Sequence, residues 1–370
     1  MKKNLFFGLC AASMLLMTSC DKEAFGGRFG EQETNVTLSV TLPELQTATR
    51  AYGTGVNAKY LQYAVYSLNA QGAINEEIKK VDNVEMTGAI PTTQISLKLV
   101  PGSKYSIVLW ADAYGKDNTN SPFTVAMSTD ANTMTVKTEN HICKMAINDD
   151  MSDAFYGSFV ITANPQENNN NGYTITEFDG TEIGGNLLML KRPFAQLNIA
   201  TANEDLVLAE NSDFEITHTT VKISAVQNIL DLRTGKLLGD GVETEYSLNE
   251  IPNDWKKDEY TTYTLLSMNY ILMPKDKDVQ NVTFYYSNGT TTKNKYYANV
   301  PLRRNWRTNI YGELFTNPVN ITIQIAPAFA NETSEDEEDK AANGDSDIHD
   351  TDNNDMYDAN VDKDGNITFE

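Results

Sequence analysis

Apolar residues recur at every second position in many short stretches of this chain, and this period constrains its fold more than any other feature. In one stretch, threonine and serine separate the apolar residues Val36, Leu38, Val40 and Leu42. Such alternation predicts strands that bury one face. Similar stretches span residues 61–68, 94–100, 105–111, 134–137, 157–163, 195–200, 219–224, 263–273, 279–286, 295–300 and 319–326. Turn-forming pairs such as Asn288-Gly289 lie between them.

The order of these stretches predicts an all-β fold. Many short strands divided by turns, without a strand–helix–strand rhythm, favour antiparallel β-sandwiches over parallel sheets. A polar, glycine-rich stretch at residues 168–186 suggests a boundary, so we expect two sandwich domains in series, at residues 51–185 and 186–330. Helix is expected only in short pieces near residues 148–155 and 253–258.

The first twenty residues are typical of a bacterial lipoprotein leader. A positively charged start precedes an apolar segment at residues 5–17, which is short for a membrane span. Two small residues then lead to Cys20, which would receive lipid after removal of a signal peptide at residues 1–19. The alternative is an ordinary secretory leader with an incidental cysteine. Both interpretations predict export, and the first predicts a lipid anchor in the outer membrane.

The chain has three cysteines, and the leader accounts for two of them. Cys10 would leave with the signal peptide and Cys20 would carry lipid, so no disulfide can form within the mature chain. We expect the remaining Cys143 to be a buried structural thiol rather than a reactive one.

The net charge of −22 is concentrated near the end of the chain. Residues 332–364 contain 14 acidic side chains and two lysines, a net of −12 that leaves −10 for the other residues. This balance excludes nucleic acid as a partner, because phosphate binding requires surfaces rich in lysine and arginine. The acidic tail at residues 331–370 is poor in large apolar residues, and we expect it to be disordered in isolation.

Five motifs, in order along the chain, resemble those of the fimbrillin superfamily of Bacteroidales. The lipoprotein leader is the first, and residues 49–53 resemble the site at which an arginine-specific surface protease cuts family precursors. Residues 190–197 resemble the start of the family's second domain. Residues 302–312 resemble its arginine-rich strand, and residues 319–327 resemble the strand that follows.

The resemblance implies a non-enzymatic pilus subunit with two transthyretin-like β-sandwiches. It implies a lipoprotein precursor whose residues 20–50 form a propeptide, cut between Arg50 and Ala51 at the cell surface. The strand at residues 36–42 would then be removable, and its loss would open a groove for a strand of another pilin subunit. Such exchange is head-to-tail, so it builds a filament, here one that serves cell adhesion.

Two segments could supply the exchanged strand. The first repeats the apolar alternation of residues 36–42 with Val319, Ile321, Ile323 and Ile325. This segment could equally be the last strand of its own second domain. The second candidate is the shorter segment at residues 366–370, which the acidic tail tethers.

The acidic tail departs from the pattern of fimbrial stalk subunits and favours a tip or accessory role.

The acidic tail also contains a partial calcium loop, in which Asn360, Asp362 and Asp364 alternate before a glycine. No glutamate follows at the twelfth loop position in this sequence, so at most weak calcium binding is expected. The alternative is a hairpin turn, and we expect no metal site and no cofactor.

No enzymatic motif emerges from the sequence. The three histidines have no metal-ligand spacing, and no phosphate-binding glycine loop or nucleophile elbow is present. The main rival function is a lipid-anchored adhesin or glycan-binding lipoprotein that does not polymerise. That function would use exposed aromatic residues, and Trp255 in a predicted loop and one tyrosine of each adjacent pair (285–286 and 296–297) are candidates.

Overall fold

The structure is a computed structural model of the chain. It describes residues 33–43, 55–164, 172–210, 214–252, 255, 263–276, 278–316 and 321–327. For residues 326–327, 355–357, 359–361 and 367–369 it describes the backbone alone. All of these residues belong to one compact unit that spans Glu33–Glu370. Within them, no helix has the length and apolar character needed to cross a membrane.

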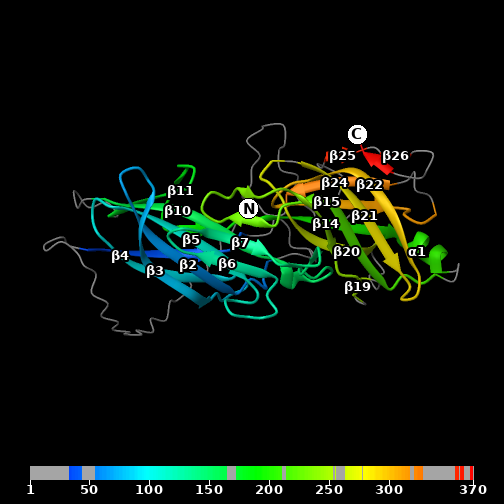
Figure 1. Cartoon of the computed structure of the whole chain (residues 1–370), viewed down its shortest axis with the longest axis horizontal. Coiled ribbons are helices and arrows are strands. Elements are labelled where there is room, and N and C mark those ends of the chain that lie inside the picture. Colours follow the sequence, from blue (N-terminus) through cyan, green and yellow to red (C-terminus); the bar gives the residue numbers. More distant parts are fainter. Residues whose placement is uncertain are drawn as a thin grey trace, which may run out of the picture. The chain divides into compact units, whose positions relative to one another are not determined.

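In the described part of the first half, two sheets pack face to face (Figure 1). The smaller sheet has the strand order β13 (Leu187–Met189), β1 (Thr34–Thr41), β4 (Thr92–Leu99). The larger sheet has the order β12 (Glu182–Ile183), β11 (Tyr173–Glu177), β10 (Phe155–Ala163), β5 (Lys104–Asp112), β2 (Tyr60–Leu68), β3 (Ile74–Glu85). One apolar core joins Leu38 of the smaller sheet with Val65 and Ile107 of the larger one. We call this pair of sheets the first sandwich.

The described residues of the second half form another pair of sheets around a shared apolar core. One sheet has the order β20 (Tyr263–Leu272), β14 (Phe194–Ala202), β23 (Trp306–Gly312), β24 (Ile321–Pro327), β25 (Asp355–Tyr357). The other has the order β26 (Ala359–Val361), β27 (Ile367–Phe369), β22 (Thr292–Leu302), β21 (Asp278–Ser287), β15 (His218–Val226), β18 (Val242–Tyr246), β9 (Ile142–Cys143), β8 (Thr138–Glu139). The short strand β19 (Asn249–Glu250) also pairs with β15. We call this pair of sheets the second sandwich.

A smaller sheet connects the two sandwiches. Its order is β17 (Leu237–Leu238), β16 (Ile229–Asp231), β7 (Asn132–Val136), β6 (Phe123–Met127). An aromatic series continues across the junction, because Phe123 lies 5.2 Å from Trp110 and 5.9 Å from Phe194, between ring centroids. The two halves of the chain also share strands across the predicted boundary at residues 185–186. The strand β9 precedes this boundary but pairs within a sheet of the second sandwich, whereas β13 follows it but pairs within a sheet of the first.

A fully buried ion pair also lies at this junction. The Arg192 guanidinium donates from Nε and Nη2 to the two carboxylate oxygens of Asp153, at 2.8 and 2.6 Å, and both side chains are 0% exposed. Burial raises the pKa of Asp153, and the positive charge of Arg192 opposes that rise. Either charge alone would be costly to bury, so the two side chains must stay together. The pair therefore holds the segment that leads into β14 next to the segment that leads into β10.

The structure confirms the all-β fold class and the predicted strands that it describes, with shifts at their ends. The predicted helix at residues 148–155 is wrong, because only a 3-10 turn forms there, at Asp150–Ser152. The helix α1 (Asn203–Glu210) was not predicted. Most of the other predicted helix, at residues 253–258, lies outside the described residues.

Three predictions about single side chains can be compared with the structure. Cys143 is buried, as predicted. Trp255 is also buried, so the prediction that it offers an exposed platform is wrong. In the tyrosine pairs, Tyr286 and Tyr297 point into the core, which follows from the alternation of side chains along a strand.

Candidate strand-exchange site

The strand β1 lies in the middle of its sheet, between β4 and β13. It pairs with β4 in antiparallel register from Thr34 opposite Leu99 to Thr41 opposite Thr92, and with β13 in parallel register. On the β13 side, Ser39 N donates to Asn186 O at 2.9 Å. The first strand of the described chain therefore has neighbours on both edges, and its removal would leave β4 and β13 each without a partner.

The inward side chains of β1 are inserted into the core of the first sandwich. Val36, Leu38 and Val40 of β1, and Leu42 just after it, are between 0% and 2% exposed. Burial of such a side chain contributes about 1.5–3 kcal/mol, so the four together contribute roughly 6–12 kcal/mol before the entropy of ordering the strand is subtracted. Binding an apolar, alternating strand is therefore the chemistry that this site can perform.

The connection between β1 and the rest of the chain falls in residues 44–54, which lie outside the described residues. The predicted cleavage position, Arg50 and Ala51, lies within it, and the lipidation residue Cys20 also lies outside. The described residues on either side of this segment lie close together, because a Cβ atom built on Gly55 would lie 3.7 Å from Cδ1 of Leu42.

The first donor candidate forms β24 and belongs to the second sandwich of its own chain. It pairs along its length with β23, from Gly312 opposite Ile321 to Trp306 opposite Pro327, and also with β25. Three apolar residues predicted for the donor are buried: Ile321, Ile323 and Ile325. The fourth, Val319, lies outside the described residues.

Sequence reasoning missed a polar network that holds β24 in this sheet. Asn309 of β23 donates to Gln324 of β24 at 3.2 Å and accepts from Asn198 of β14 at 2.8 Å. All three amides are buried. The available signal was the presence of polar residues inside otherwise apolar strands, which is unfavourable unless their hydrogen bonds are made.

The terminal candidate, residues 366–370, contains the backbone of β27 (Ile367–Phe369). It pairs in parallel with β22, with Ile367 opposite Tyr297, and in antiparallel with β26. Asn360 lies in β26, whereas Asp362 and Asp364 of the calcium loop lie outside the described residues. Elsewhere among the residues that the structure describes, no group of three or more histidine, cysteine, aspartate or glutamate side chains could hold a metal ion.

The environment of Cys143 indicates a structural thiol. Burial raises the pKa of this thiol to about 11, so the reactive thiolate is scarce at neutral pH. The side chain lies in the core of the second sandwich rather than beside β1.

A family model described as a family of unknown function, DUF6562, matches residues 28–357. No curated protein matches the chain. Among solved structures, a fimbrial assembly protein from Parabacteroides distasonis is 14% identical, with a TM-score of 0.40 over 80% of this chain and 97% of that one. The fimbrial anchor protein Mfa2 from Porphyromonas gingivalis is 10% identical, with a TM-score of 0.41 over 80% and 96%.

A third match is a structure of candidate polysaccharide binding proteins from Bacteroides thetaiotaomicron, with 16% identity and a TM-score of 0.39 over 81% of this chain and 98% of that one. The matched structures thus include fimbrial and cell adhesion proteins of Bacteroidales.

Proposed function

The chain belongs to the DUF6562 family, and we propose that it is a non-enzymatic subunit of a cell-surface fimbria that assembles by strand exchange and serves adhesion. The observation that carries the proposal is the position of β1. This strand is first among the described residues, is central in its sheet, and has an inner face that is completely buried. A fimbrial assembly protein and a fimbrial anchor are among the solved structures that the chain matches.

In this proposal the precursor is a lipoprotein held in the outer membrane through Cys20. An arginine-specific surface protease cuts after Arg50, so that Ala51 becomes the first residue and β1 is held only by non-covalent contacts. While it remains in place, β1 fills the groove between β4 and β13 and prevents premature pairing. Cleavage makes the strand replaceable.

Replacement of β1 by a strand of another subunit supplies the same backbone pairs and apolar contacts. Each subunit gives a strand to one neighbour and receives one from another, so the contact is head-to-tail and the assembly grows as a filament. The donor is either the segment that includes Ile321, Ile323 and Ile325 or the terminal segment at residues 366–370. The first of these would have to leave β23 before it could be donated.

The test is to treat the full chain with an arginine-specific protease and to follow its mass and assembly by mass spectrometry and size-exclusion chromatography. The wild-type chain should be cut after Arg50, lose the peptide that contains β1, and form a ladder of larger species. The variant Arg50→Ala should retain β1 and stay monomeric.

The matched control is Arg28→Ala, which removes another arginine on the N-terminal side of β1. It should assemble as the wild-type chain does, because cleavage at residue 28 leaves β1 attached. Assembly of Arg50→Ala at the wild-type rate would contradict the proposal. A wild-type chain that is cut after Arg50 yet keeps β1 and stays monomeric would favour the non-polymerising lipoprotein instead.

A further inference from the structure

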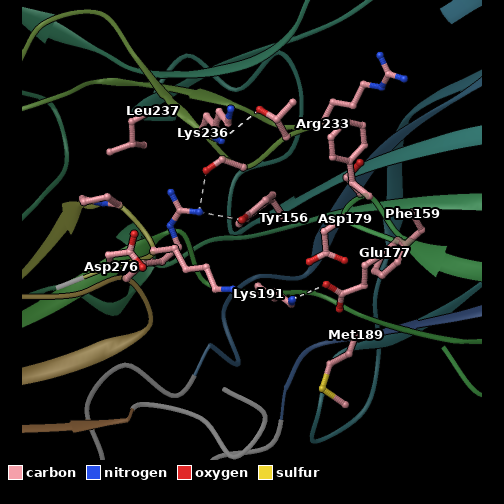
Figure 2. Close-up of a pocket in the computed structure, with 18 of the residues that line it drawn as sticks. Tyr156, Phe159, Glu177, Asp179, Met189, Lys191, Arg233, Lys236, Leu237 and Asp276 are labelled. Carbon is pink, nitrogen blue, oxygen red and sulfur yellow. Dashed lines mark hydrogen bonds and ion pairs between the residues drawn. The ribbon is translucent and has the colours of Figure 1, made fainter. Parts of the chain in front are cut away.

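A cavity of about 500 Å³ lies where the first sandwich meets the turn between β16 and β17 (Figure 2). Its walls come from β10, the end of β11, the β16–β17 turn and the loop at residues 274–276. Its volume falls in the range of about 300–1,000 Å³ that is typical of sites for small ligands. No residue of β1 lines it, although Met189 of β13, which pairs with Thr41 of β1, does.

The wall of this cavity contains a buried and fixed positive charge. Arg304 is 4% exposed, and its Nη1 donates to the Tyr156 hydroxyl at 2.9 Å and to Gly235 O at 2.8 Å. Gly235 has a φ of +70°, and a Cβ atom there would lie 2.7 Å from the Tyr156 hydroxyl oxygen. Only glycine therefore fits at this turn, and the turn holds the guanidinium in place.

Four further cationic side chains line the cavity: Lys191, Arg233, Lys236 and Lys275. Lys236 and Lys275 are exposed, and their ammonium groups make no hydrogen bond or ion pair with any residue that the structure describes. With Arg304, these side chains give five positive charges against three carboxylates. In a chain with a net charge of −22, this local excess of positive charge favours a ligand that carries negative charge.

The three carboxylates restrict the kind of anion. Figure 2 shows Asp276 on one side of the cavity and Asp179 and Glu177 on the other. The Glu177 carboxylate accepts from Lys191 Nζ at 2.7 Å, and a hydrogen bond from Thr181 N holds the pKa of Asp179 below its ordinary value. These groups would repel a ligand with many negative charges. They can accept hydrogen bonds from hydroxyl groups.

An aromatic surface completes the cavity. Phe178 is 39% exposed, and the Arg233 guanidinium lies 5.2 Å from the centre of its ring. A partly exposed ring next to charged and hydrogen-bonding groups suits a ligand that has both apolar faces and hydroxyl groups.

We infer that this cavity binds an acidic sugar, in which one carboxylate meets Lys236, Lys275 and Arg304 while hydroxyl groups donate to the acidic residues. The ring of the sugar packs against Phe178. The subunit thereby carries a glycan-binding site of its own, distinct from the groove that β1 fills.

The test is calorimetric titration of the full chain with a disaccharide of glucuronic acid and N-acetylglucosamine. The matched ligand is the same disaccharide with its carboxyl group reduced to an alcohol, which should bind at least tenfold more weakly. The variants Lys236→Ala and Lys275→Ala should each weaken binding of the acidic disaccharide by about threefold to tenfold, because each removes one charged partner. Phe178→Ala should weaken binding of both disaccharides.

The control variant is Lys104→Ala, which removes an exposed lysine of β5 that does not line the cavity. It should leave the affinity unchanged. Absence of binding, equal affinity for the reduced disaccharide, or equal effects of Lys104→Ala and Lys236→Ala would each overturn the inference. Tighter binding of hexaglutamate than of the acidic disaccharide would also overturn it, since the cavity would then recognise an acidic peptide.

Discussion

Leu38 of β1 lies directly opposite Ile95 of β4, and both side chains are at most 1% exposed. Opposite residues in an antiparallel pair have Cβ atoms about 4.5–5.5 Å apart, so the two side chains pack as a unit. A strand that replaces β1 must therefore present an apolar side chain at this position. The register between β1 and β4 thus specifies what kind of segment the groove accepts.

We expect Leu38→Ala to lower the free energy of unfolding of the uncleaved chain by about 2–5 kcal/mol, because it leaves a cavity in a packed core. The control Thr37→Ala changes an exposed side chain of the same strand and should alter it by less than about 0.5 kcal/mol. Urea denaturation followed by circular dichroism measures both. Equal effects of the two substitutions would show that β1 is not held in its groove.

Substitution of a buried and of a half-buried side chain in β24 distinguishes its two predicted roles, as a strand of the second sandwich and as a donor strand. If β24 is an integral strand of the second sandwich, Ile323→Ala should destabilise the monomer by about 2–5 kcal/mol, and the half-buried neighbour Thr322→Ala should have a small effect. If Ile323→Ala leaves the monomer unchanged but reduces assembly after cleavage, β24 acts chiefly as a donor. Denaturation of the monomer and chromatography of the cleaved chain provide the two measurements.

The pair formed by Arg192 and Asp153 is expected to be essential for stability at the junction. Asp153→Ala leaves a buried guanidinium without its partner and should cost about 3–5 kcal/mol. Asp82 forms an exposed ion pair with Lys116, so Asp82→Ala is the control and should cost less than about 1 kcal/mol. A loss for Asp153→Ala no larger than that of the control would contradict the structural role of the pair.

Cys143 should be protected from alkylation until the chain unfolds. Its pKa is raised from an ordinary value of 9.0 to about 11, so the folded chain holds roughly 100-fold less thiolate at pH 8. Because the unfolded chain ionises first, any contribution of this thiol to stability is lost as the pH rises from about 9 to about 11. Iodoacetamide labelling at pH 8, with and without urea and resolved by peptide mass spectrometry, checks the expectation; rapid labelling of the folded chain would contradict it.

Strands whose alternation is regular could be predicted from the sequence, as β1 and β4 show. The strand β3 could not, because it contains six charged residues and its inward residues, Ile78, Val81 and Val84, are spaced by three. Two irregularities in the pairing with β2 fall within this stretch, one between Val81 and Val84 and one at Ile78. Local periodicity does not reveal such bulges, since they depend on the neighbouring strand.

The strand-exchange site and the cavity around Arg304 also differ in whether the sequence predicts them. The inner face of β1 follows from its own alternation and could be named in advance. The cavity around Arg304 could not, because it combines Tyr156, Gly235 and Arg304, which are far apart in the sequence. The buried partner of Arg192 was likewise not predictable, since Asp153 lies 39 residues earlier in the sequence.

The most direct test of the account is the intact mass and N-terminal sequence of the protein recovered from the surface of its native host. Strand exchange predicts a mature chain that begins at Ala51 and lies in high-mass assemblies without the peptide that contains β1. A monomeric chain that still begins at a lipidated Cys20 would contradict it.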